Sequence, residues 1–368
     1  MDDDNRPTRL FNASDVIDRS KREAAKSVGL LLLTASLGLR VPSYAVAAST
    51  DGSSDVAPQP WGDPSTLVSV IAAGTLAVPS VAETVDAYTK GFGYVELWRG
   101  RIPPEIADFW GTPAMADRIA AVVGPPEHDH GLIRIVELGD DFQQADFHET
   151  LGWVALEIRV RSPDVMVSQL KGLPFVHAGG PGDSSTKDGA PSYRAAQFKG
   201  PSGEPLYFTQ HAQLDSLLAL GPNNVGPLFI QTLAARPYRE TRDFYLKTLA
   251  MKSRMEVDVR RTNLANRFSL PEDRLYKMAA VRAPEYCSIQ IDEYPEAINP
   301  RPSAHECLVP GACMCTFATQ DLDLIASALR QSGLPFSEID SHSMLPSTGR
   351  RALACRGYSG EIVEFIER

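Results

Sequence analysis

The closing stretch of the chain, residues 362–366, places one acidic side chain, Glu364, among apolar ones. Because side chains alternate along a strand, Val363 and Phe365 would share one face, while Ile362, Glu364 and Ile366 share the other. Apolar surroundings disfavour a charged carboxylate and raise its pKa toward the range of a general base. We therefore predict that Glu364 is the catalytic carboxylate. The alternative role for this side chain is a buried salt bridge.

Residues 127–130, with the sequence Glu-His-Asp-His, form a second group of side chains that could take part in chemistry. Carboxylates and imidazoles can bind metals, but Pro125 and Pro126, directly before them, mark an exposed turn. We therefore predict a solvated loop here rather than a metal centre.

The cysteines all lie in the C-terminal half, and no histidine or cation is indicated as the partner of a nucleophilic thiol. We predict that they are buried as small apolar side chains. One disulfide would suit an exported protein, but its connectivity is not encoded in the sequence. The five residues are Cys287, Cys307, Cys313, Cys315 and Cys355.

Glu364 would be positioned by a unit of one strand, one helix and three further strands. The pattern predicts a strand over Cys313–Thr319, a helix beginning near Asp321, a Gly-Leu-Pro break and a closing strand over Ile362–Ile366. Other units begin in the same way. We expect strands over Val70–Val78, Leu132–Leu138 and Val154–Val160, helices over Val81–Lys90 and Asp164–Lys171, and a lid or extra helix in the insert Arg99–Gly124.

Sequence repeats extend this unit over the rest of the chain. The sequence Gly-Leu-Pro-Phe at residues 172–175 returns at 333–336, and related Gly-x-Ser-Gly-Glu sequences end at Glu204 and Glu361. Four pairs of positions, each 12 residues apart, connect a first strand to its helix: Leu76 and Tyr88, Ile158 and Leu170, Leu233 and Tyr245, Phe317 and Leu329. The first and third pairs are themselves 157 residues apart. The chain is therefore predicted to contain four βαβββ modules of the α+β class, arising from a duplicated two-module piece.

The N-terminal region is typical of an export signal. A basic stretch precedes the apolar run Gly29–Leu39, which is too short to span a bilayer, and Ala45-Val46-Ala47 offers a cleavage site. Ser20-Lys21-Arg22 resembles a twin-arginine motif with lysine in the first arginine position. We expect a signal-like segment over residues 1–48, a flexible leader over 49–65 and a periplasmic or secreted mature protein. A disordered tail with one short helix is the alternative.

Overall charge restricts the partners that we expect. The formal net charge of −10 argues against nucleic acid and against an anionic membrane surface, and the mature chain is expected to have no membrane span. A small-molecule substrate is the expected partner. A homodimer is compatible with the sequence.

The four modules, the Phe244-Tyr245 pair after a first strand and the closing Gly-Glu-x-x-Glu-Phe sequence together resemble the vicinal oxygen chelate superfamily. That superfamily includes glyoxalase I, extradiol dioxygenases and bleomycin-resistance proteins. The resemblance implies two glyoxalase-like half-open barrels, which we expect over residues 66–213 and 226–368. It also implies a divalent metal inside a barrel, held by first and last strands of the modules.

Aligned on this family, the last-strand positions are Arg134, Tyr207, Gln290 and Glu364. The first-strand positions are Ala73, Ala155, Ile230 and Met314. Glu364 and Gln290 are the oxygen ligands in this set, so the usual metal site is expected to be missing or rebuilt.

The resemblance implies roles for these inward residues. Glu364 and Gln290 would be catalytic, with Gln290 polarising a carbonyl, while Tyr207, Arg134, Met314 and Ile230 would bind substrate. As structural alternatives, Arg134 could pair with Glu157, and Tyr207 could be a core ring.

Three hypotheses for the function follow. The first is an exported lyase or isomerase that acts on a small oxygenated or aromatic substrate by carboxylate-assisted proton transfer. The second is a metal-dependent dioxygenase or lyase of the same fold. The third is a non-catalytic binding protein of the resistance type.

Overall fold

The structure is a computed structural model that describes residues 66–126, 128–143, 150–185, 191–211, 220, 224–260, 269–271, 273–284, 287–296, 298–301 and 306–368. The predicted signal-like segment 1–48 and leader 49–65 lie outside the described residues, as does Glu127.

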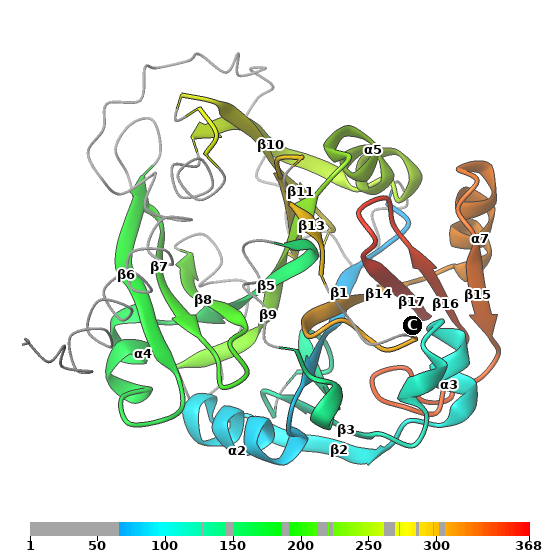
Figure 1. The fold of residues 1–368 in the computed structure, drawn as a ribbon, viewed down its shortest axis with the longest axis horizontal. Coiled ribbons are helices and arrows are strands. Elements are labelled where there is room, and N and C mark those ends of the chain that lie inside the picture. The colour runs from blue at the N-terminus through cyan, green and yellow to red at the C-terminus, as the bar shows by residue number, and fades with distance from the viewer. Residues whose placement is uncertain are drawn as a thin grey trace, which may run out of the picture.

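Four modules follow one another along the chain, each opening with a long buried strand and a short helix (Figure 1). The first comprises β1 (Val70–Val78), α2 (Val81–Phe92), β2 (Val95–Arg101), α3 (Pro104–Phe109), β3 (Ile119–Gly124) and β4 (Leu132–Glu137). The second comprises β5 (Thr150–Val160), α4 (Pro163–Gln169), β6 (Val176–Ser185), β7 (Pro191–Lys199) and β8 (Pro205–His211).

The second half repeats this order. The third module comprises β9 (Val225–Ala235), α5 (Tyr238–Asp243) with a π-helical turn over Phe244–Thr248, β10 (Lys252–Arg260), β11 (Leu275–Arg282) and β12 (Ser288–Glu293). The short β13 (Asn299–Pro300) leads to the fourth module, which comprises β14 (Gly311–Thr319), α7 (Leu322–Gln331), β15 (Phe336–Ile339), β16 (Ala352–Arg356) and β17 (Ile362–Glu367). The α+β class and the four βαβββ modules are confirmed.

Local signals explain where the helices begin and end. The Ser80 side chain caps α2 by accepting a hydrogen bond from the Glu83 N–H, and Gly93 ends the helix with a φ of 71°. Asp321 caps α7 in the same way, through the N–H groups of Asp323 and Leu324. The helix predicted to begin near Asp321 is therefore present.

The strands form two curled sheets, each of which joins modules distant in the chain. The first sheet has the order β15-β16-β17-β14-β1-β4-β3-β2, so it unites modules one and four. The second has the order β10-β11-β12-β9-β5-β8-β7-β6 and unites modules two and three. In Figure 1 the blue β1 accordingly lies beside the orange β14, and the green β5 beside β9.

The sequence leaves the pairing of the modules open, and the sheets pair them across the expected ranges 66–213 and 226–368. The pairing depends on which first strands meet in space: β1 pairs antiparallel with β14, and β5 pairs antiparallel with β9. Each half-barrel therefore combines one module from each of these ranges: modules one and four in the first, and modules two and three in the second.

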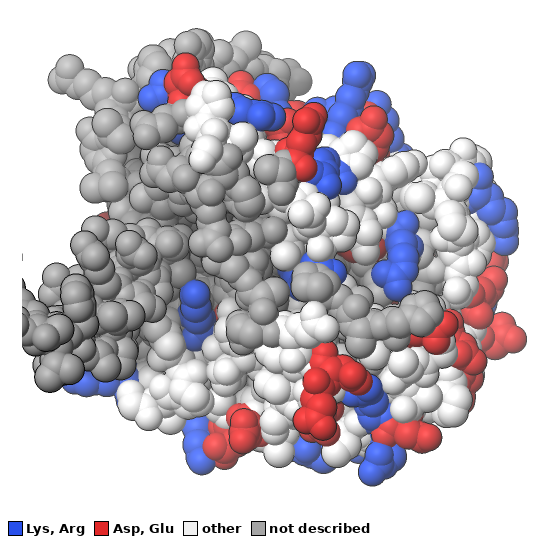
Figure 2. Space-filling model, viewed as in Figure 1, with Lys and Arg blue, Asp and Glu red and all other residues white. Residues whose placement is uncertain are grey.

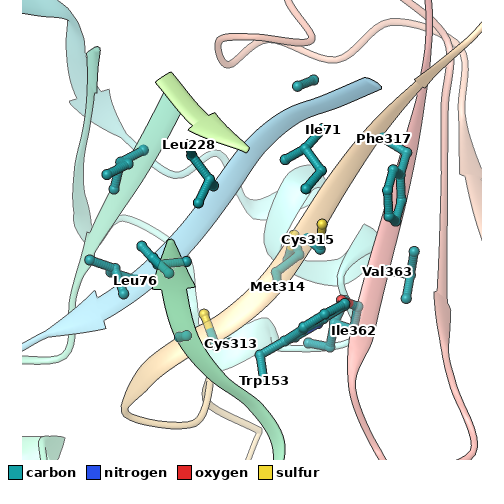
Figure 3. Packing of buried hydrophobic residues seen from close by; sticks show 14 of the residues in the cluster. Ile71, Leu76, Trp153, Leu228, Cys313, Met314, Cys315, Phe317, Ile362 and Val363 are labelled. Carbon is teal, nitrogen blue, oxygen red and sulfur yellow. The ribbon is translucent and has the colours of Figure 1, made fainter. Parts of the chain in front are cut away.

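The two barrels share one apolar core, seen from close by in Figure 3. The Trp153 ring, from β5, lies against β17, and its Nε1 donates to the Ile362 carbonyl at 2.9 Å. Gly74 on β1 lies at a close approach of the two barrels, because a Cβ there would be 2.7 Å from the Leu228 side chain. A larger residue at position 74 would push the barrels apart.

The repeated Gly-x-Ser-Gly-Glu turns also connect the two barrels. Tyr88 in α2 donates to Glu204 before β8 at 2.8 Å, and Tyr245 donates to Glu361 before β17 at 3.3 Å. Each bond joins a helix of one barrel to a turn of the other. Both carboxylates are fully enclosed, and burial raises the pKa of Glu204 and of Glu361 to about 7.

All five cysteines are buried with free thiols, as predicted for small apolar side chains, and no disulfide joins them.

None of the helices in the described part of the chain is long and apolar enough to cross a membrane. On the face shown in Figure 2, acidic and basic side chains are interspersed over the described surface.

Candidate active site in the second barrel

The predicted site residues divide between the two barrels. Arg134, Met314 and Glu364 belong to the first, whereas Tyr207, Ile230 and Gln290 belong to the second. They therefore do not form one site.

In the first barrel, the central strands bring Arg134 and Glu364 together. Arg134 pairs across β4 and β1 with Thr75, which in turn lies opposite Met314 on β14. Thr316, two residues further along β14, lies opposite Glu364 on β17. The Arg134 Nη2 and the Glu364 Oε2 are 3.0 Å apart, and both side chains are 0% exposed.

Two more donors and a histidine ring complete the surroundings of Glu364. The Thr316 hydroxyl donates to Oε2 at 2.6 Å, and the Trp110 indole donates to Oε1 at 2.9 Å. His342 Nε2 lies 3.2 Å from Oε1. His342 Nδ1 accepts the Met344 N–H at 3.1 Å, which orients the ring so that Nε2 faces the Glu364 carboxylate. Both carboxylate oxygens are thus occupied by protein groups.

The predicted rise in the pKa of Glu364 is wrong. Burial alone would raise it, but the charge of Arg134 and the hydrogen bonds from His342 and Thr316 hold the pKa of this carboxyl well below its usual range. Glu364 is therefore a permanent anion in a buried ion pair, the alternative role that the sequence left open. Arg134 pairs with Glu364 and not with Glu157, which lies in the other sheet.

Segments outside the sheet fill the first barrel. Trp110, directly after α3 in the predicted insert, stacks on the Arg134 guanidinium at 5.1 Å. The loop that carries His342 adds the Leu345 carbonyl, which accepts from Arg134 Nε at 3.4 Å. Met314 is fully buried, with its sulfur 3.5 Å from Arg134 Nη1. These contacts leave Arg134, Met314 and Glu364 no access to a substrate.

The second barrel presents a different inner face. Glu157 on β5 lies opposite Tyr207 on β8 and opposite Ile230 on β9. The next row of residues paired across these strands, two positions further along, contains Ala155, Thr232 and Gln290. Their sequence neighbours, such as Leu156 and Ile158, point the other way into the helix-covered core, so these rows line the inside of the barrel.

Glu157, Ile230 and Gln290 are all half-buried, in contrast to the sealed first barrel. Desolvation of the Glu157 carboxyl raises its pKa to about 7, while Thr209 and the charge of Arg254 act in the opposite direction. A carboxylate that is reached by solvent and titrates near neutral pH can accept a proton from a bound molecule.

The neighbours of Glu157 can orient such a molecule. Tyr207 is 7% exposed and carries a phenol on the strand next to Glu157. The Gln290 amide nitrogen donates to both oxygens of Asp292 at 3.2 Å, which fixes the amide and directs its oxygen away from Asp292. Ile230 supplies apolar surface beside them. Three of the predicted site residues are therefore gathered around a carboxylate that was not among them.

Glu157 carries the same sequence signal as Glu364. It is the one acid in the apolar strand Thr150–Val160, just as Glu364 follows Val363 in the closing strand. The family alignment selected Ala155 at the first-strand position instead. A register shift in the β5–β9 pairing falls between Trp153 and Ala155, and it is not visible in the sequence pattern.

Among the residues that the structure describes, neither barrel presents a donor set that fits a divalent metal. In the first, the Arg134 guanidinium lies against the carboxylate, and a cation would be repelled from it. In the second, the inner face combines the carboxylates of Glu157 and Asp292 with a phenol and an amide, rather than three imidazole, carboxylate or thiolate ligands, and the Asp292 oxygens already accept from Gln290. Among the described residues, no cluster of three His, Cys, Asp or Glu side chains is close enough to bind an ion.

The histidine-rich loop lies at the surface, as predicted. His130 Nδ1 is 2.9 Å from the exposed Asp129 carboxylate, and the His128 and His130 rings are 5.6 Å apart. A separate surface hollow of about 430 Å³, near Arg101, Arg118 and Asp141, contains none of the predicted site residues.

Comparison of the sequence with protein families and with curated proteins gives no match. Comparison of the structure with solved structures does give matches. A structure described as glyoxalase I from Zea mays is 16% identical and has a TM-score of 0.50, over 81% of this chain and 92% of that one. A putative dioxygenase from Bacillus subtilis is 12% identical with a TM-score of 0.55, over 82% and 86% of the two chains. The chain therefore has the fold of the vicinal oxygen chelate superfamily, with four modules arranged as two half-open barrels.

Proposed function

We propose that the protein is an enzyme, a lyase or isomerase, that binds a small oxygenated or aromatic substrate in the second barrel and transfers a proton through Glu157. The observation that carries the proposal is a solvent-reached carboxylate with a pKa of about 7 on the inner face of this barrel. The catalytic role expected of Glu364 is thereby moved to Glu157, and Gln290, Tyr207 and Ile230 keep the roles expected of them.

The geometry supports a simple proton transfer. A Glu157 oxygen takes a proton from a carbon beside a substrate carbonyl, and the electron pair moves onto the carbonyl oxygen as an enolate. A hydrogen bond from the Tyr207 phenol stabilises that oxygen. Glu157, now neutral, returns the proton to another substrate atom and completes an isomerisation, or the enolate expels a leaving group in a lyase reaction.

Exchanging Glu157 for glutamine tests this role while keeping the side-chain shape. A panel of small oxygenated and aromatic compounds is first screened by thermal shift, because a ligand of the folded state raises the melting temperature. For each compound that is turned over, Glu157→Gln is expected to retain binding and lose about 10²–10⁴-fold in kcat. Glu364→Gln is the contrasting change, because Glu364 is sealed in the other barrel. Turnover unchanged in Glu157→Gln contradicts the proposal.

A binding protein without catalysis is the second candidate. It is favoured by apolar side chains that remain exposed inside the barrel, among them Met255 at 41% and the half-buried Met278. Methionines adapt to the shape of aromatic ligands. Binding of panel compounds without turnover by the parent protein would identify this function.

We also propose that the protein acts after export to a periplasmic or extracellular space. The support is the basic stretch, apolar run and small-residue site within residues 1–48. Cell fractionation with N-terminal sequencing of the mature protein tests it, with a new N-terminus expected near residue 48. An uncleaved chain in the cytoplasm contradicts it.

A further inference from the structure

Arg254 reaches the inner face of the second barrel through a β-bulge. The register between β10 and β11 pairs Ser253 with Val281 and Met255 with Ala280, so Arg254 is the extra residue. Bulges re-aim the side chain of the extra residue. The Arg254 Nη2 lies 2.9 Å from Nε2 of His211 on β8.

This contact places Arg254 across the barrel rather than along the sheet. His211 and Tyr207 alternate with Phe208 on β8, and Phe208 points into the helix-covered core. In the strand order, β10 and β8 are separated by β11, β12, β9 and β5. A side-chain bond between them means that the sheet curls back on itself, with Arg254 and His211 together on its concave side.

Arg254 differs from the other charged residues of β10 in its pairing. Glu256 pairs with Arg242 at 2.8 Å and Asp258 pairs with Lys277 at 2.7 Å, both on the other side of the strand. Among the described residues, no carboxylate lies within ion-pair distance of Arg254. The positive charge of Arg254 also acts to lower the pKa of Glu157, in keeping with the placement of both groups on the concave side of the sheet.

Apart from Arg254, the described inner face of β10 and β11 is mostly apolar, with Gln290 and Asp292 beyond it on β12. Met255 and Val257 on β10 lie opposite Ala280 and Met278 on β11, and all but Ala280 are exposed or half-buried. A ligand that fills this space would therefore meet an apolar wall, a cation at one end and the Glu157 carboxylate near it.

We infer that Arg254, held by His211, recognises a carboxylate on the substrate, so that the substrate is a small compound with an anionic head and an apolar or aromatic body. This inference rests on the proposed function for the location of the site. Arginine is suited to the role because its planar guanidinium can form two parallel hydrogen bonds to a carboxylate. Neutralising Arg254 in this way would also make Glu157 a stronger base, because Arg254 now acts to lower its pKa.

Matched carboxylate and amide pairs test the inference on the full-length protein. The probes are phenylacetate and phenylacetamide, benzoate and benzamide, and hexanoate and hexanamide, with phenyl phosphate as a different anion. Dissociation constants are measured by calorimetry for the parent, Arg254→Met and Arg260→Met. Arg260, exposed at the end of the same strand, is the matched control.

We expect at least one carboxylate to bind about tenfold or more tightly than its amide in the parent and in Arg260→Met. Arg254→Met should remove this preference and leave the affinity for the amide unchanged. Equal affinities in every pair, a preference that survives Arg254→Met, no saturable binding of any carboxylate, or tighter binding of phenyl phosphate would each overturn the inference.

The two proposals fail in distinguishable ways. Carboxylates preferred through Arg254 but never turned over would uphold the recognition and contradict the enzyme. Neutral compounds turned over in a Glu157-dependent manner, with no preference for their acids, would uphold the enzyme and contradict the recognition.

Discussion

Glu157 and Glu364 show how the same residue in the same sequence context acquires opposite properties. Each is an acid with an apolar residue directly before and after it on a strand, and each faces the inside of a barrel. Glu364 receives hydrogen bonds from Arg134, Trp110 and Thr316, so its charged form is stabilised. Glu157 has Thr209 nearby and a more distant arginine, so burial dominates and its pKa rises.

The buried pair in the first barrel makes a quantitative prediction. Arg134→Met should lower the free energy of unfolding by about 3–5 kcal/mol, because it leaves the Glu364 carboxylate buried without its cation. Adding Glu364→Gln should recover much of that loss, because a neutral amide can accept from Trp110 through its oxygen and donate to the Thr316 hydroxyl through its nitrogen. Denaturant unfolding of the parent, both single variants and the double variant gives the coupling free energy between Arg134 and Glu364. Additive effects of the two changes would mean that the pair is not coupled.

Sequence reasoning identified the position of Glu364 but not its ionisation. Strand alternation placed it inside the barrel, and it is 0% exposed. Its partners Arg134 and Trp110 lie 230 and 254 residues away, and no local pattern connects them. Arg134 was likewise placed on the inner face by the family resemblance, but its role as the counter-ion of Glu364 appears only once modules one and four are joined.

At the scale of elements, the strands were the most predictable part. The expected strand Val70–Val78 coincides with β1, and the expected helix Val81–Lys90 ends two residues before α2 does. Long apolar strands and capped helices carry their own signals. The insert Arg99–Gly124 was expected to be a lid or extra helix, and it contains α3, followed by the indole of Trp110 that closes the first barrel.

The tyrosine–glutamate bonds between helices and turns predict a matched pair of effects. Tyr88→Phe and Tyr245→Phe should each cost about 1–3 kcal/mol of stability, because each leaves a buried carboxylate with one donor fewer. Tyr358→Phe is the control, since that ring is 39% exposed and should change stability by less than about 0.5 kcal/mol. Thermal and urea unfolding compare the three. Equal effects at all three positions would show that the hydrogen bonds do not matter.

At the scale of the molecule, duplication has given two barrels with different interiors. The first is filled by Arg134, Trp110 and the loop of His342, and it adds stability and positions the shared core. The second keeps a solvent-reached inner face with Glu157. The four modules could be predicted from repeats because a repeated unit leaves a repeated sequence. Their pairing could not, because each first strand offers a similar edge and the choice between edges depends on contacts such as that of Trp153 with Ile362.

The turns that join the barrels also predict how stability depends on pH. The pKa of Glu204 and that of Glu361 are raised from 4.5 to about 7 in the folded chain. Between these values the folded chain keeps protons that the unfolded chain has released, so stability is greatest at the acidic end and falls as pH rises toward 7. Glu364 does not contribute to this slope, because its lowered pKa keeps it ionised in both states above pH 4.5. From about pH 5 to pH 7.5, the parent should lose a few kcal/mol relative to the variant carrying Glu204→Gln and Glu361→Gln. Comparing the two proteins by urea unfolding at each pH cancels the histidines and surface groups that they share. Parallel pH profiles would show that neither glutamate is protonated in the folded chain near neutral pH.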